Sequence, residues 1–155
     1  MDVDTPVTTL RARPDWVYLL QDLYEFYRAI PAGGSAKIRG HQRAVRERIS
    51  KALARNVPLR ERAPATKPVL AHLTRAFARA RLERHAPFMA TLEAVQGELE
   101  WLYGYEKVPR GLEHKFAFAE LAGPNGPVVI DDLILGLVLF APGTTYPAHA
   151  HRGIT

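Results

Sequence analysis

The chain has 155 residues, of which 47% are hydrophobic and 24% are charged, with 12 Pro, 11 Gly and no Cys. This length fits one domain, or a small domain with part of a second, and the apolar fraction excludes a wholly disordered or collagen-like protein. Without cysteine there is no disulfide, thiolate metal site or cysteine nucleophile, so any metal must be held by His and carboxylate side chains.

The net charge of +5 is unevenly distributed. Residues 35–85 contain 14 Lys and Arg against three Glu, whereas the segments before and after carry net charges of −2 and −4. A basic block is compatible with nucleic-acid binding. However, residues 35–73 contain no aromatic side chain, which single-strand binders use for base stacking. We therefore interpret the block as solvated helix surface and do not expect nucleic acid as a partner.

No targeting or membrane segment is visible. The acidic N-terminus lacks the basic flank and apolar run of a signal peptide. The longest apolar stretch, residues 133–141, is about half as long as a bilayer-spanning helix. We expect a cytoplasmic protein with no membrane contact.

Apolar side chains at three- and four-residue spacing predict four helices in the N-terminal part. The expected ranges are residues 14–30, 35–56, 68–85 and 87–102. Pro14 and Asp15 favour the start of the first helix, and Ser35 is the expected N-cap of the second. The first 13 residues are predicted to be a loose arm, and residues 57–67, with two prolines and alternating charges, a linker.

After Tyr105 the pattern becomes typical of strands. We expect strands at residues 115–121, 128–130 and 133–140, the last apolar enough to be buried on both faces. The sequence therefore predicts an α+β protein with a helical N-terminal region, residues 1–105, followed by a β-structure, residues 106–155. Three or four strands are too few to close a barrel.

The last thirteen residues carry the clearest chemical signal. His149 and His151 are separated by Ala150, and residues two apart on a strand project from the same face. Two imidazoles can then converge on one metal such as Fe, Zn, Mn, Ni or Cu. An isolated His-X-His pair is weak evidence, but its place after an apolar strand and Pro142-Gly143 favours a metal site.

Gly143, five further residues and the His pair match the start of the first cupin motif, Gly-X5-His-X-His. Within cupins, residues 136–151, preceded by helices and the Trp-Leu-Tyr-Gly-Tyr segment at residues 101–105, resemble the bacterial dimethylsulfoniopropionate (DMSP) lyases. The resemblance is clearest over residues 101–155. It implies that the strands are the first of a cupin barrel (a double-stranded β-helix, or jelly roll).

The resemblance also implies a carbon–sulfur lyase that eliminates dimethyl sulfide from DMSP and leaves acrylate. It assigns His149 and His151 to a divalent transition metal (Fe, Zn, Mn or Ni), and Tyr146 to a catalytic role in contact with metal or substrate. A metal on the substrate carboxylate would act as a Lewis acid and could lower the pKa of a tyrosine beside it. Aromatic faces would favour the cationic sulfonium group.

Parts of the family's motif are not found in the sequence. In the family a glutamate follows the His pair after three or four intervening residues, and here it would fall on position 155, which is Thr, or beyond it. The tyrosine that follows this glutamate, which is the usual candidate for the base, and a later histidine are also missing. We therefore expect a truncated or interrupted lyase that has little or no activity alone.

The remaining candidates have more ordinary interpretations. We expect surface positions for the histidines His41, His72, His85 and His114, and a turn at Asp131 and Asp132. We expect packing roles for Tyr103 and Tyr105, and the polar side of a helix for Glu93, Glu98 and Glu100. Two alternatives stay open: a cupin dioxygenase or isomerase, and a non-enzymatic helical module whose basic surface binds an acidic partner or nucleic acid. The small-molecule substrate is the expected partner, and the sequence leaves open whether the chain forms a homodimer.

Overall fold

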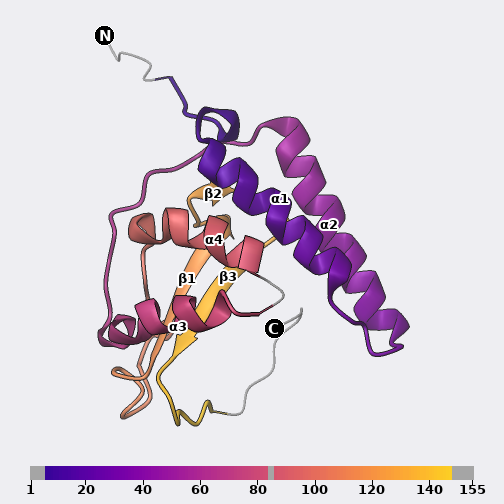
Figure 1. Cartoon of the computed structure of the whole chain (residues 1–155). Coiled ribbons are helices and arrows are strands. Elements are labelled where there is room, and N and C mark those ends of the chain that lie inside the picture. Colours follow the sequence, from indigo (N-terminus) through magenta and orange to yellow (C-terminus); the bar gives the residue numbers. More distant parts are fainter. Residues whose placement is uncertain (1–5, 84–85, 148–155) are drawn as a thin grey trace.

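The computed structural model describes residues 6–83 and 86–147. Four helices precede a three-stranded sheet: α1 (Pro14–Ala29), α2 (Ala36–Arg55), α3 (Leu73–Ala80), α4 (Ala86–Val95), β1 (Phe116–Gly123), β2 (Val128–Val129) and β3 (Leu135–Phe140). Helix α1 packs against both α2 and α4, and α3 and α4 lie over the sheet (Figure 1). The predicted α+β class, a helical region followed by the first strands of a sheet, is confirmed.

Both ends of α2 have local causes. The Ser35 hydroxyl accepts a hydrogen bond from the Ile38 amide at 3.2 Å, so the predicted N-cap is confirmed. Asn56 ends the helix in the left-handed region, with φ of 52°. Its side-chain oxygen accepts from the Arg11 amide at 2.7 Å, and its amide nitrogen donates to the Thr9 hydroxyl at 2.9 Å. Asn56 therefore joins the end of α2 to the N-terminal segment.

The segment before α1 differs from the predicted loose arm. A 3-10 helix, Leu10–Ala12, precedes α1, and Leu10 is only 1% exposed. The Leu10 amide donates to the Val57 carbonyl at 2.9 Å, and Thr9 forms a β-bridge with Pro58. Burial of the Leu10 side chain offsets the cost of ordering this segment.

The predicted linker is an ordered, extended segment along the sheet. Leu59 forms a β-bridge with Val128, and the Arg60 amide donates to the Pro127 carbonyl at 2.8 Å. The polar backbone groups at the edge of the short strand β2 are thereby paired. Prolines and charges predicted the lack of helix correctly, but not this pairing.

The third and fourth helices are shorter than predicted. A 3-10 helix, Pro68–His72, replaces the start of the third, and α4 ends at Val95 before another 3-10 helix, Gln96–Glu98. Leu102 lies on no helix, because it exchanges two 2.7 Å backbone hydrogen bonds with Phe118 of β1. Strand pairing overrides the helical spacing of the apolar side chains here.

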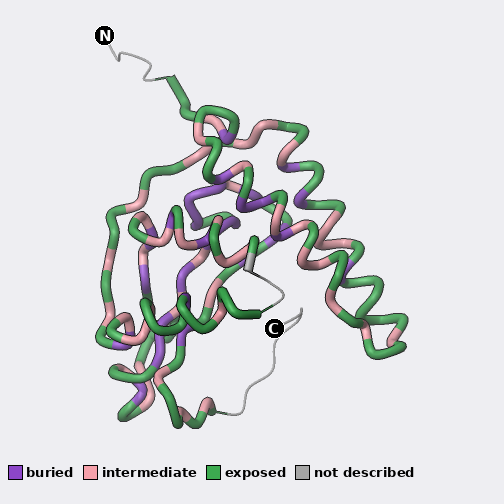
Figure 2. Tube along the Cα trace, in the orientation of Figure 1, coloured by how far each residue is buried: buried purple, intermediate pink, exposed green. Residues whose placement is uncertain are grey.

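The sheet has one covered and one open face. Strand β1 is central, antiparallel to β3 and parallel to β2. Leu121 and Leu139 share a core with Trp16 and Leu20 of α1, and Figure 2 shows buried stretches along α1 and the sheet. On the other face, Val138 and Phe140 are 42% and 37% exposed. The prediction that residues 133–140 are buried on both faces is therefore wrong.

This core contains residues from both sides of the predicted boundary between residues 105 and 106. The boundary marks a change of secondary structure, and the division into two domains stays a prediction. Within the described residues, no helix is long and apolar enough to cross a membrane.

Gly136→Ala tests the packing of the open face, and Gly40→Ala on α2 gives the comparison without a close neighbour. A Cβ atom at Gly136 would overlap the ring of Phe118, so we expect Gly136→Ala to lower the free energy of unfolding by about 1 kcal/mol. Gly40 lies inside α2 with open space around it, so Gly40→Ala should raise that free energy by about 0.5–1 kcal/mol. Urea unfolding measures both, and a stabilising effect at Gly136 would contradict the described contact.

Candidate active site

The chain reverses direction after β3 at the glycine of the Gly-X5-His-X-His motif. The Ala141 amide still donates to the Lys115 carbonyl at 2.9 Å, which extends the pairing with the start of β1. Gly143 then has a φ of 71°, in the left-handed region that other residues rarely adopt. The Thr144 hydroxyl donates to the Ala141 carbonyl at 2.7 Å and closes the turn. This turn directs Tyr146 back over the sheet.

Tyr146 belongs to an aromatic cluster that consists of Tyr105, Phe116, Phe140 and Tyr146. The Tyr146 ring stacks on Phe116, with centroids 5.5 Å apart and planes at 20°, and meets Phe140 at 4.9 Å and 65°. Phe116 and Phe140 are register partners of β1 and β3, and the Tyr105 ring lies 5.8 Å from Phe116. The cluster therefore forms at the end of the sheet where β1 begins.

The surroundings of Tyr146 raise its pKa above the usual value. Burial is the largest cause, because it disfavours the phenolate, and a hydrogen bond with the Tyr105 hydroxyl adds to it. The fold without metal therefore does not lower the pKa of Tyr146, as a metal beside it is expected to do. In this environment the Tyr146 hydroxyl keeps its proton and is a hydrogen-bond donor, and a lower pKa would require a positive charge beside it.

Sequence spacing does not connect Tyr146 with its three aromatic neighbours. Tyr105 has the expected packing role, against Phe116, but its hydroxyl also contacts the candidate catalytic residue Tyr146. The alternation of Phe116, Phe118 and Glu120 placed Phe116 on one face of a strand. Only the register with β3 shows that this face is shared with Phe140 and Tyr146.

The predicted metal ligands His149 and His151 lie outside the described residues, as does His85. Among the described histidines, His41 and His114 are exposed and His72 is half-buried. Within residues 6–83 and 86–147, no group of three His, Asp or Glu side chains could hold a metal ion. The assignment of the two histidines therefore stays a prediction.

The acidic candidates have structural roles. Each of the three glutamates forms an ion pair with an arginine from another segment: Glu93 with Arg81, Glu98 with Arg13, and Glu100 with Arg62. The Arg13 guanidinium contacts both Glu98 oxygens, at 2.7 and 2.9 Å, and this contact raises the pKa of Arg13. Asp131 and Asp132 form the predicted bend before β3.

Comparison with known proteins identifies the family. The family model of dimethylsulfoniopropionate lyases matches residues 41–153, which is well over half of the chain. This chain belongs to the DMSP lyase family. The match begins in α2, so the helical region is part of the family's sequence pattern as well as the strands.

Two DMSP lyase relatives support the assignment. The putative dimethylsulfoniopropionate lyase DddL of Cereibacter sphaeroides is 45% identical over 141 residues, which cover 91% of this chain and 61% of the relative. A chain from the crystal structures of the DMSP lyases RdDddP and RnDddQII is similar with a TM-score of 0.56 and 25% identity, covering 84% of this chain and 60% of that chain. This chain thus spans about three-fifths of the length of each.

Tyrosine ionisation tests the environment of Tyr146. We expect the ultraviolet absorbance of the metal-free protein, with a chelator present, to show a tyrosine that ionises above the usual pKa of about 10 and that Tyr146→Phe removes. The neutral phenol of Tyr146 adds to the free energy of unfolding. This contribution is complete below the pKa of Tyr146 in the unfolded chain, and it is lost as the pH rises through the higher pKa of Tyr146 in the folded protein.

Two variants identify the cause of the raised pKa. Tyr105→Phe should lower the pKa of Tyr146 towards its usual value, because it removes the hydrogen bond and keeps the ring. Tyr18→Phe is the control, since Tyr18 is 57% exposed on α1 and its loss should leave the Tyr146 step unchanged. Ionisation of Tyr146 at or below the usual pKa would contradict the described contacts.

Proposed function

We propose that this chain forms part of a metal-dependent DMSP lyase, which converts DMSP into dimethyl sulfide and acrylate. The family match over residues 41–153 carries the proposal. The aromatic cluster supports it, because one of its members, Tyr146, lies three residues before His149. Membership of the DMSP lyase family favours this function over a cupin dioxygenase or isomerase and over a basic binding module.

The aromatic cluster is suited to the dimethylsulfonium end of the substrate. Tyr105 and Phe140 are each 37% exposed, and Tyr146 is half-buried above Phe116. The negative potential of aromatic ring faces attracts a cation, and the attraction grows when water is excluded. We assign the cluster to this end of the substrate, and the Tyr146 hydroxyl to a hydrogen bond with the carboxylate end.

The metal would be held by His149 and His151. An imidazole pair three and five residues after Tyr146 fits Fe, Zn, Mn or Ni, because neutral imidazole is a common ligand of all four. When bound, the metal supplies a Lewis acid for the substrate carboxylate. Two imidazoles are fewer than the three protein ligands usual in a catalytic site, so we expect the 155-residue chain alone to release little or no dimethyl sulfide.

The elimination needs one base and no acid. A base takes the proton from the carbon next to the carboxylate, the electron pair of this C–H bond forms the double bond of acrylate, and the carbon–sulfur bond breaks. Sulfur leaves with the bonding pair as neutral dimethyl sulfide, so no group has to protonate it. Tyr146 acts here as a hydrogen-bond donor: its phenol contacts the substrate carboxylate and stabilises the negative charge that develops there.

Gas chromatography of dimethyl sulfide tests this function. The assay compares the 155-residue chain with the same chain extended by the C-terminal sequence of the C. sphaeroides relative, each with added Fe, Zn, Mn or Ni. We expect release from the extended protein, loss of release in His149→Ala, and a decrease of about 100-fold in Tyr146→Phe.

His41→Ala is the matched control, because His41 is exposed on α2 and should not affect turnover. An extended protein that is folded and metal-loaded but releases no dimethyl sulfide from DMSP would refute the lyase. Equal losses in His41→Ala and His149→Ala would refute the assignment of the metal ligands.

A further inference from the structure

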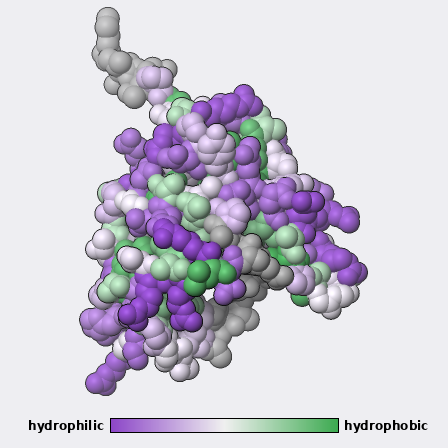
Figure 3. Space-filling view, viewed as in Figure 1, coloured by the Kyte–Doolittle hydropathy of each residue, from purple (hydrophilic) through white to green (hydrophobic). Residues whose placement is uncertain are grey.

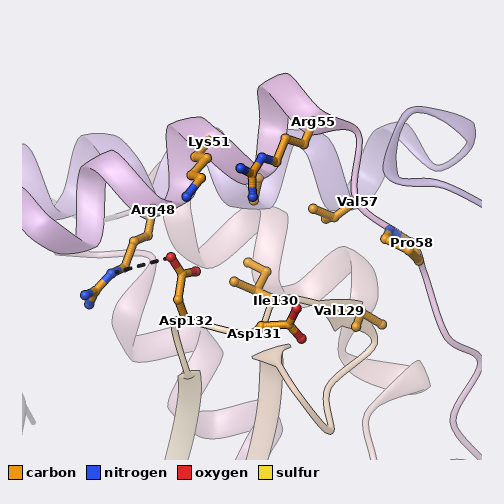
Figure 4. A pocket seen from close by; sticks show the side chains of 10 residues that line it. Arg48, Lys51, Arg55, Val57, Pro58, Val129, Ile130, Asp131 and Asp132 are labelled. Atoms are coloured by element: carbon orange, nitrogen blue, oxygen red, sulfur yellow. Dashed lines mark ion pairs between the residues drawn. The ribbon is translucent and has the colours of Figure 1, made fainter.

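A second candidate site lies between α2 and the turn that joins β2 to β3. It is a cavity of about 400 Å³ (Figure 4). Arg48, Lys51 and Arg55 extend towards it from α2. Because these residues are three and four positions apart, they share one face of the helix. Hydrophilic side chains also gather over α2, at the right-hand edge of Figure 3.

The three cationic side chains on the α2 side of the cavity outnumber the two carboxylates that line it. Asp131 and Asp132 lie on the opposite wall, and Arg48 Nε is 3.8 Å from Asp132 Oδ2. Within the part of the chain that the structure describes, the side chains of Lys51 and Arg55 form no hydrogen bond or ion pair with another residue. Since they are neighbours four positions apart, an anion held between them would relieve their mutual repulsion.

The remaining lining is apolar. Ala52 and Ile130 are buried, Val57 and Val129 are half-buried, and Pro58 lies at the rim. A ligand that fits this cavity needs an anionic group for the α2 wall and an apolar part for its floor. The guanidinium of Arg55 has the planar donor arrangement that matches a carboxylate.

We propose that this cavity is a binding site for a small carboxylate with a short apolar chain, held by Lys51 and Arg55. The three cations exceed the two carboxylates of the lining by one charge, which suits a monoanion. The inference rests only on the cavity and does not depend on the proposed lyase activity.

The cavity is separate from the aromatic cluster. Phe116, which lies under Tyr146, is the first residue of β1, whereas Gly123 at the other end of β1 pairs with Val129 of the cavity wall. A strand rises about 3.3 Å per residue, so the two places are about 20 Å apart. Binding in the cavity therefore involves none of the residues assigned to the reaction.

Titration of the chain with sodium propionate at constant ionic strength, followed by amide NMR, tests the site. We expect saturable shifts in residues 51–55 and 129–132. The double variant Lys51→Gln/Arg55→Gln should weaken binding about tenfold or more, because charge-assisted hydrogen bonds are lost. Arg43→Gln is the matched control: Arg43 is exposed on the same helix but does not line the cavity.

Asp131→Asn gives a test of opposite sign. Removal of this carboxylate should strengthen propionate binding several-fold, because a like charge leaves the cavity. If the double variant fails to fold in a thermal melt, Asp131→Asn decides the question alone. The proposal is overturned if propionate causes no saturable shifts, or if inorganic phosphate binds more tightly than propionate. It is also overturned if Arg43→Gln weakens propionate binding as much as the double variant does, or if Asp131→Asn weakens it.

Discussion

The antiparallel pairing of β1 with β3 determines where the other features lie. It aligns Phe116 with Phe140 at one end of the sheet and places Ala122 beside Leu135 near the other end, after a register shift between Glu120 and Ala122. Side chains alternate along each strand, so this register also separates a leucine-rich face from a face with phenylalanines. A slip of one residue would turn the leucines away from α1 and remove the surface on which Tyr146 stacks.

The helices cover only one of the two faces. Helix α1 supplies Trp16 and Leu20 to the core, and α2 and α4 pack on either side of it. The N-terminal segment is held at the end of α2 by the backbone hydrogen bond from Leu10 to Val57 and by the side chain of Asn56. The other face keeps exposed apolar side chains, among them Val138 and Phe140.

The two candidate sites differ in their chemistry because they lie at opposite ends of β1. At the Phe116 end, stacked rings and a protonated phenol suit a cation and hydrogen bonding to a carboxylate. At the Gly123 end, cations from the basic block of α2 face a short acidic turn. The basic block is solvated surface as expected at Arg43, Lys51 and Arg55, which are all exposed, and Lys51 and Arg55 also line the cavity.

Local chemistry in the sequence determined the helix and strand types, the Ser35 cap and the resemblance to DMSP lyases, because each depends on residues close together in the chain. The ends of α3 and α4, the ordering of Leu10 and the pairing of Leu102 with Phe118 depend on contacts between distant segments, which spacing alone does not encode. Contacts between distant segments also form the candidate active site around Tyr146. Tyr146 was identifiable from its motif, but its neighbours and the direction of its pKa follow from a register that only the folded sheet defines.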